Sequence, residues 1–247
     1  MKYFAKVKYL GTDFHGFQVQ PEHRTVQGEL CLALQSAIGS ACKVTGCSRT
    51  DAGVHANEFC ITVESENATV PPEKLPLAVA RFLPPDLSLY YAREVDESFH
   101  PRYSVKSKEY LYRIHNSRIN DPFCHGRAWL LNPPISDVAL DKMKKAASFI
   151  VGKKDFATFM AEGSDVTDTV REVFYLTVER IGEFIEIRIC ADGFLYNMVR
   201  IIVGTLTEVA YGRISPEDME DIINSKKRSR AGMTAPACGL YLNQVNY

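Results

Sequence analysis

The order in which strand-like and helix-like patterns follow one another occurs twice in this chain of 247 residues. Strand patterns place apolar side chains at every second position, and helix patterns at every third or fourth. In the first half they predict strands near residues 2–9, 42–47, 58–64 and 87–95, and helices over 25–38 and 72–83. In the second half they predict strands near 105–115, 170–180, 183–190 and 240–245, helices over 136–152 and 197–211, and a short helix after Ser215-Pro216. Both halves have the order βαββαβ, which is that of the ferredoxin-like fold.

This repeat predicts an α+β fold with two ferredoxin-like halves, residues 1–103 and 104–247, whose antiparallel sheets lie side by side around a cleft. The repeat lies in the order of the elements and not in sequence identity. Local signals support the first helix in particular. Thr25 is a typical N-cap residue, and Gly39 follows the last apolar position of the pattern.

Composition is that of a soluble globular protein, with 46% hydrophobic and 24% charged residues. No apolar run is long enough to span a bilayer, and the first eight residues alternate like a strand instead of forming the apolar stretch of a signal peptide. The seven cysteines are odd in number, widely spaced and without a C-x-x-C pair, which argues against a disulfide framework and against zinc. No phosphate-binding loop, H-E-x-x-H or dinucleotide fingerprint occurs. These features predict a cytoplasmic enzyme without a metal site.

The net charge is −1, so the chain as a whole has no preference for nucleic acid. Basic residues nevertheless gather in two segments. The first contains Arg102, Lys106, Lys108, Arg113 and Arg118 around one acid, Glu109, and the second contains Lys226, Lys227, Arg228 and Arg230. Because a polyanion needs a basic face and not a basic total, both segments are candidate nucleic-acid contacts. Ordinary solvated charge explains them equally well.

The densest group of chemically active side chains is the segment 47–55, Cys-Ser-Arg-Thr-Asp-Ala-Gly-Val-His, between two predicted strands. Asp51 precedes Ala52-Gly53, and glycine lets a backbone approach a ligand closely. The guanidinium of Arg49 favours the ionised form of Asp51, which can serve as a nucleophile or a general base. Most Asp-x-Gly sequences, however, are turns in which the aspartate bonds to its own backbone. These residues alone leave both interpretations open.

The histidines near this motif also have two interpretations, one functional and one structural. His55 has the chemistry for acid–base catalysis, but a histidine that orients a loop by hydrogen bonding is the preferred interpretation. In the loop that follows the first strand, Asp13, His15 and Gln18 are candidates to line the same cleft, and turn chemistry is the alternative.

Two residues of the second half complete the set of candidates. Tyr110 lies on the strand that opens this half, beside Lys108, and an aromatic ring next to a basic side chain suits base stacking. A core aromatic residue is the simpler interpretation. Arg200 lies off the apolar stripe of the 197–211 helix, with Gly204 one turn further along the same side, so it is expected on an open surface from which it reaches a carboxylate across a cleft. Plain solvent exposure is the alternative.

Several segments, in the same order along the chain, resemble the tRNA pseudouridine synthase A family. Arg49-Thr50-Asp51-Ala52-Gly53-Val54-His55 resembles the active-site motif of that family. Further resemblances cover residues 9–18, 25–30, 99–104, 108–112, 194–204 and 234–242. The chain departs from the usual pattern at Phe17, Ser48, Tyr196-Asn197 and Met233, which affects substrate contacts and not the chemistry.

The resemblance implies isomerisation of uridine to pseudouridine in the anticodon stem-loop of tRNA, at positions 38–40 in standard tRNA numbering. It implies that Asp51 is the essential aspartate, that Tyr110 packs on the target base and that Arg200 pairs with the aspartate, with Arg49 as a further catalytic candidate. It also implies a homodimer whose RNA-binding cleft is built from both subunits, with tRNA as the partner and with no metal or organic cofactor.

Two other classes of protein fit part of this pattern. A non-catalytic RNA-binding protein would also use paired ferredoxin-like sheets, but pure binding rarely places a carboxylate against phosphates. A glycosidase would also use an aspartate, but it usually needs a second carboxylate as the acid, and segment 47–55 offers none. For the synthase, the residues do not decide whether Asp51 attacks C1′ of the ribose or removes the C2′ proton.

Overall fold

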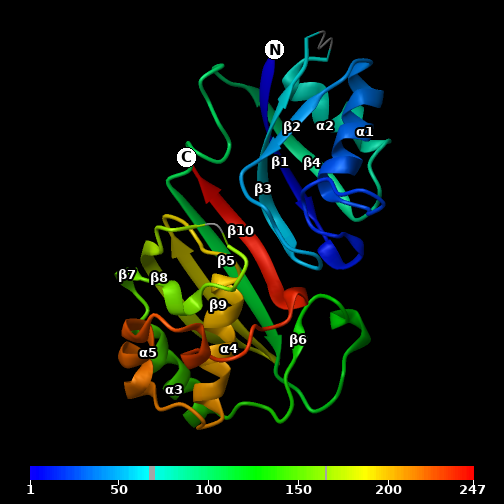
Figure 1. Cartoon of the computed structure of the whole chain (residues 1–247). Helices are drawn as coiled ribbons and strands as arrows, with labels where there is room; N and C mark the ends of the chain where they lie inside the picture. The colour runs from blue at the N-terminus through cyan, green and yellow to red at the C-terminus, as the bar shows by residue number, and fades with distance from the viewer. Residues whose placement is uncertain (67–69, 165) are drawn as a thin grey trace. The chain divides into compact units, whose positions relative to one another are not determined.

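The structure is a computed structural model that describes residues 1–66, 70–164 and 166–247 (Figure 1). Within these residues the chain forms two compact units, Met1–Lys106 together with Tyr241–Tyr247, and Ser107–Leu240. Each unit combines helices with a mostly antiparallel sheet, so the fold belongs to the mixed α+β class. Over these same residues, no helix has the length and apolar composition needed to cross a membrane.

The first unit is organised around its central strand, β1 (Lys2–Tyr9). This strand pairs antiparallel with β3 (His55–Glu64) on one side and with β4 (Leu87–Glu94) on the other. Strand β2 (Lys43–Gly46) pairs antiparallel with β3 on the far side from β1. The four strands therefore have the order β4-β1-β3-β2, and all four agree with the strands predicted from the sequence.

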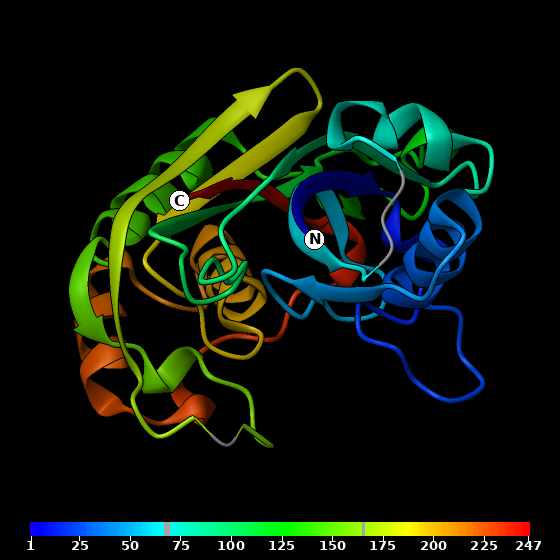
Figure 2. The same cartoon turned by 90° about the horizontal axis from the view of Figure 1, so that it is seen from above.

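Two helices cover one face of this sheet (Figures 1 and 2). Helix α1 (Val26–Ile38) begins where expected, because the Thr25 hydroxyl accepts the Gly28 N–H at 3.3 Å, and it ends at Gly39, which has φ 78°. Helix α2 (Leu75–Ala80) is shorter than predicted. Residues Pro72–Lys74 form a separate 3-10 turn, which leaves only one and a half turns of α-helix after it.

The last strand, β10 (Leu240–Asn246), belongs mostly to the first unit although it follows the second unit in sequence. It pairs with β3 in parallel, with Tyr241 opposite His55 and Leu242 opposite Ala56. Its neighbours in the first unit therefore include the residue that follows the Arg49–Val54 segment.

The second unit contains an antiparallel sheet with the order β5-β9-β8-β7. Its strands are β5 (Ser107–His115), β7 (Gly152–Asp155), β8 (Val170–Ile181) and β9 (Phe184–Ala191), and the short β6 (Trp129–Leu130) pairs in parallel with β5. Its helices are α3 (Asp137–Ser148), α4 (Met198–Ala210) and α5 (Met219–Ser225), with α3 packed on α4 and on β8. The helix predicted over 136–152 ends earlier than expected, because Gly152 already begins β7.

Candidate active site

The segment Arg49–Val54 forms a tight loop between β2 and β3, as the sequence predicts. Gly53 has φ 79°, a left-handed conformation that favours glycine, and the Val54 N–H donates to the Asp51 carbonyl at 3.2 Å to close the turn. The Asp51 side chain is half-buried and the Ala52 side chain is exposed. The loop thus holds a partly exposed Asp51 on a backbone that has few alternative conformations.

Contacts with the first loop of the chain fix this turn from the side. The buried Thr50 hydroxyl lies 2.8 Å from the Tyr9 hydroxyl, and the Thr50 carbonyl accepts the Phe17 N–H at 3.1 Å. Gly16, with φ 82°, packs so closely that an added Cβ would lie 2.5 Å from the Thr50 carbonyl oxygen. Residues on both sides of Asp51 are therefore positioned before any substrate binds.

His55 acts as a scaffold, which confirms the preferred interpretation. Its side chain is fully buried, and its Nδ1 accepts the Gly11 N–H at 2.8 Å. Its ring stacks on Tyr241 with the centroids 4.5 Å apart. Because Nδ1 is an acceptor here, it carries no proton, and His55 connects the first loop to the start of β3 and to β10.

Arg49 is exposed, and across the described residues no ion pair or hydrogen bond of its side chain is found. Its place two residues before Asp51 remains the only basis for giving it a role. Asp51 and Arg49 lie in the first unit, whereas Tyr110 and Arg200 lie in the second.

An ion pair that the sequence analysis missed fixes the far side of the first loop. Arg24 donates to both carboxylate oxygens of Asp86, at 2.8 and 2.9 Å, and to Glu29 at 3.1 Å. The Leu10 N–H donates to the Asp86 carbonyl at 2.9 Å, so the two ends of the loop meet at the start of β4. The hydrogen bonds from Arg24 keep the pKa of Asp86 below its ordinary value. Arg24 and Asp86 lie 62 positions apart, and no local pattern connects them.

We expect Asp86→Asn to lower the free energy of unfolding by about 1–2 kcal/mol at neutral pH, because an amide cannot accept two charge-assisted hydrogen bonds from Arg24. The pKa of Asp86 is lower in the folded chain than in the unfolded chain. The stabilisation is therefore complete above the unfolded value, about 3.9, and is lost as the pH falls through the folded value. Melting temperatures of the two chains should differ by a constant amount at neutral pH and converge below about pH 4. A difference that grew in acid would contradict this assignment.

In the second unit, Tyr110 lies on β5 opposite Ile189 of β9. It is largely buried, with 8% of its surface exposed, and its ring makes an edge contact with Phe194 at a centroid distance of 5.0 Å. Its neighbour on the same face, Tyr112, is fully buried and donates its hydroxyl to the Pro236 carbonyl at 2.7 Å. Burial raises the pKa of Tyr112, so its hydroxyl stays protonated and structural.

Arg200 lies in the first turn of α4 and is anchored on both sides. Its Nε donates to the Ala235 carbonyl at 2.7 Å and its Nη1 donates to Asn197 Oδ1 at 2.8 Å. Asn197, which has φ 58°, precedes the helix. The guanidinium of Arg200 therefore has a fixed orientation.

The expectation that Gly204 lies on an open surface is wrong. Helix α4 is buried on nearly all sides, and an added Cβ at Gly204 would lie 1.8 Å from the Met233 carbonyl oxygen. Segment 232–235 covers this side of the helix, and Gly232 donates its N–H to the Thr205 hydroxyl at 2.9 Å. The glycine allows close backbone packing, and that packing brings the Ala235 carbonyl to Arg200.

Some residues of each basic segment form ion pairs or hydrogen bonds within the second unit. Lys226 pairs with Asp155 at 2.7 Å, and Arg228 donates to the Gly232 carbonyl and to the Thr234 hydroxyl. Arg113 pairs with Glu186 at 3.3 Å. The remaining exposed members are Arg102, Lys106, Arg118, Lys227 and Arg230. These five are the residues still available as candidate phosphate contacts.

Glu109, which the sequence presents as a lone acid in a basic segment, is buried. It accepts a hydrogen bond from the Tyr175 hydroxyl and lies 3.8 Å from Arg188, which itself pairs with Glu186 at 2.7 Å. These groups connect β5, β8 and β9 next to Tyr110. The alternation of apolar and polar residues along one strand does not reveal such pairs, because the paired side chains come from three separate strands.

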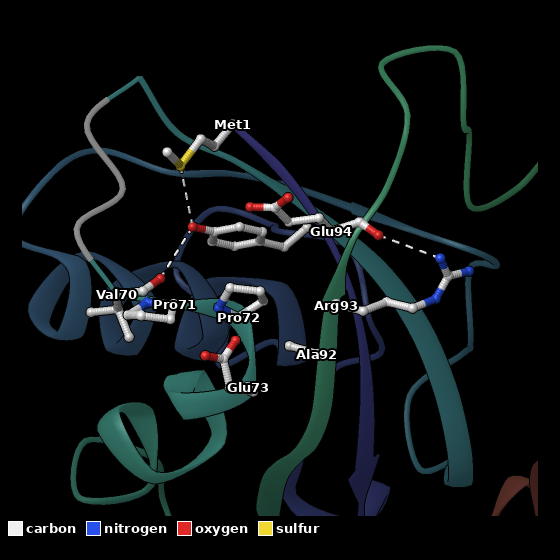
Figure 3. Close-up of a pocket in the computed structure, with 9 residues that line it drawn as sticks. Met1, Val70, Pro71, Pro72, Glu73, Ala92, Arg93 and Glu94 are labelled. Atoms are coloured by element: carbon white, nitrogen blue, oxygen red, sulfur yellow. Dashed lines mark hydrogen bonds between the residues drawn. The ribbon is translucent and has the colours of Figure 1, made fainter.

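Figure 3 shows a pocket of about 650 Å³ at the start of β1, where the Tyr3 hydroxyl donates to the Val70 carbonyl at 3.1 Å. Two carboxylates, Glu73 and Glu94, line it together with Arg93 and with Met1, whose terminal amino group donates to the Ser65 carbonyl at 3.0 Å. It lies at the opposite end of β1 from Tyr9, which contacts the Asp51 loop. Because of this position, the pocket is not part of the candidate site.

No cluster of three or more His, Cys, Asp or Glu side chains suited to a metal ion occurs in the part of the chain that is described. The seven cysteines are free thiols.

Comparison with known proteins identifies the family. A sequence profile described as tRNA pseudouridine synthase matches residues 5–104 and 146–247. A tRNA pseudouridine synthase A of Thermoanaerobacter sp. (strain X514) is 44% identical over 241 residues, which cover 98% of this chain and 97% of the relative. A protein with the same name from Moorella thermoacetica (strain ATCC 39073 / JCM 9320) is 43% identical over 97% of this chain and 96% of the relative. Another from Bacillus pumilus (strain SAFR-032) is 40% identical over 100% of this chain and 99% of the relative. With a profile match over most of its length and such relatives over nearly all of it, the chain belongs to the tRNA pseudouridine synthase family.

Proposed function

We propose that this chain isomerises uridine to pseudouridine at positions 38–40 in the anticodon stem-loop of tRNA, with Asp51 as the essential carboxylate. The observation that carries the proposal is the Asp51 loop. It is fixed by Tyr9, Gly16 and Phe17, and Asp51 itself stays partly exposed. Relatives named tRNA pseudouridine synthase A support the substrate class.

The proposed reaction moves one bond of the nucleoside. The N1–C1′ bond breaks, the uracil turns, and a C5–C1′ bond forms while C5 loses its proton and N1 gains one. Asp51 either attacks C1′ as a nucleophile or removes the C2′ proton as a base, and both routes need its ionised form. The product has the same composition as the substrate, so the reaction consumes no oxidant, reductant or water.

Tyr110 and Arg200 have the proposed roles of base stacking and of pairing with the carboxylate. The cross-strand contacts of β5 with β9 support a fixed position for Tyr110, and the bonds to Ala235 and Asn197 support a fixed direction for Arg200. Arg49 is proposed as a further catalytic residue on sequence position alone. Full turnover by a Tyr110→Ala variant would remove that residue from the proposal.

We further propose that both halves of the chain, residues 1–103 and 104–247, are ferredoxin-like and that the protein acts as a cytoplasmic homodimer. The order β4-β1-β3-β2 in the first unit and the antiparallel β5-β9-β8 in the second support this topology. The exposed bases Arg102, Lys106, Arg118, Lys227 and Arg230 are the proposed phosphate contacts. A stacked target uridine must first be extruded, at a cost of about a few kcal/mol, and contacts to the phosphates offset part of that cost. Light scattering of the purified protein tests the dimer.

The test of the function is incubation with a tRNA that carries tritium at C5 of its uridines. We expect tritium release without free uracil and without cleavage of the RNA, because C5 loses its hydrogen while the base stays attached. Binding without tritium release would indicate a non-catalytic RNA-binding protein. Release of free uracil would indicate a glycosidase.

A further inference from the structure

Two exposed histidines of the first loop lie face to face beside the Asp51 loop. The rings of His15 and His23 are stacked, with their centroids 4.3 Å apart and an angle of 14° between their planes. Both residues are exposed. Aromatic rings commonly pack in stacked arrangements, and a stacked pair at the surface offers the outer faces of its rings to a ligand.

The backbone of the loop keeps the two rings together. The His15 N–H donates to the Arg24 carbonyl at 2.9 Å, and the Gln20 side chain donates to the His15 carbonyl at 2.7 Å. Arg24 follows His23 directly and is itself fixed by Asp86. The pair is therefore attached to a rigid support and is organised in advance of binding.

The loop also sets the pair close to Asp51. Gly16, the residue after His15, would place an added Cβ 3.3 Å from the Asp51 carbonyl carbon. Consecutive Cα atoms are about 3.8 Å apart, so the backbone of His15 lies within about two residue spacings of Asp51. A ligand whose reacting atom is bound at Asp51 reaches the His15–His23 pair if the rest of the ligand extends along the first loop toward His15.

Extruding a uridine from a stem or loop removes one stacking neighbour from each adjacent base. Single-stranded bases commonly stack on aromatic side chains, histidine among them. We propose that the His15–His23 pair is a stacking platform for a base adjacent to the target uridine, and that it replaces the stacking lost on extrusion. This inference rests on the proposed function, and it adds a specificity-determining site that none of the roles of Asp51, Arg49, Tyr110 or Arg200 includes.

The test compares alanine and phenylalanine at the two positions, with tRNA as substrate. We expect His15→Ala and His23→Ala each to lower kcat/KM by roughly tenfold, in the range reported for loss of one base–aromatic stack. We expect His15→Phe and His23→Phe to stay within about threefold of the wild type, since phenylalanine keeps a stacking face. Both histidines are exposed, so the melting temperature should not change. Val19→Ala, an exposed residue of the same loop whose backbone N–H donates to Gln27, is the matched control and should leave kcat/KM unchanged.

A spectroscopic measurement separates stacking from a structural role. 2-Aminopurine placed on either side of the target uridine in an anticodon stem-loop RNA loses fluorescence when it stacks. We expect quenching on binding to the wild-type chain at one of the two positions, and no such quenching with His15→Ala. The stacking platform would be overturned if the phenylalanine variants were as impaired as the alanine variants, or if the alanine variants had normal kcat/KM. Tritium release by the wild type would in that case still support the proposed function. Absence of tritium release by the wild type would instead overturn the proposed function.

Discussion

Asp51→Asn should abolish pseudouridine formation while tRNA binding remains. Asparagine has nearly the shape of aspartate, so the loop fixed by Tyr9, Gly16 and Phe17 should keep its conformation. An amide is neither a nucleophile nor a base at neutral pH, and loss of a reacting group in other enzymes costs about 10⁴-fold or more in turnover. Removal of a negative charge near phosphates should leave the affinity equal or slightly higher.

The measurements are tritium release from C5-labelled tRNA and filter binding of the same RNA. Asp141→Asn is the matched control, because this exposed aspartate of α3 pairs with Lys144 in the second unit. It should keep full activity. Turnover by Asp51→Asn at more than a few per cent of the wild-type rate would show that another group supplies the chemistry. Loss of binding together with turnover would show that Asp51 has a structural role.

Gly204→Ala should cause a large loss of stability in the second unit. The added methyl would lie 1.8 Å from the Met233 carbonyl oxygen and 2.8 Å from its carbon, and both atoms belong to the backbone. Segment 232–235 must then move away from α4, at a cost of about 2–3 kcal/mol. For a domain of this size that corresponds to a fall of about 5–10 °C in melting temperature.

The same shift should lower activity beyond what unfolding explains. Segment 232–235 includes Ala235, whose carbonyl accepts the Arg200 Nε–H, so its displacement releases the guanidinium. We expect kcat of the folded variant to fall at a temperature well below its midpoint. Gly28→Ala in α1 is the matched control, since its methyl would meet only the Thr25 hydroxyl at 3.0 Å and alanine favours the helix. Equal melting temperatures for Gly204→Ala and the wild type would contradict the close packing of this segment.

Local patterns predicted the elements whose signals lie within one segment. Thr25 and Gly39 delimit α1 because capping involves neighbouring residues, and β9 was recognised from the alternation of Ile185, Ile187 and Ile189. Strand β7 was missed because it has only four residues, Gly-Lys-Lys-Asp, which lack a period-two apolar pattern. Its position in the sheet comes from pairing with β8, and one segment alone does not reveal that partner.

In the candidate site, too, features that depend on neighbouring residues were predictable, and contacts between distant segments were not. The Asp51 loop followed from residues within a few positions of one another, whereas the partners of His55, Gly11 and Tyr241, lie far from it in the sequence. The closure of the first loop by Arg24 and Asp86 did not follow from neighbouring residues, because the two side chains meet only after β1 and β4 have paired. The burial of Gly204 on α4 could not be predicted either, since the residues that cover it lie about thirty positions later in the chain. Contacts of this kind depend on tertiary structure, which helical periodicity does not include.

The parallel pairing of β10 with β3 also sets an order of events during synthesis. Tyr241, which stacks on His55, leaves the ribosome only after all of Ser107–Leu240 has been made. Until then, the edge of β3 at His55 and Ala56 lacks its partner strand β10. His55, which directly follows the candidate catalytic loop, therefore gains its stacking partner only after the second unit has been synthesised.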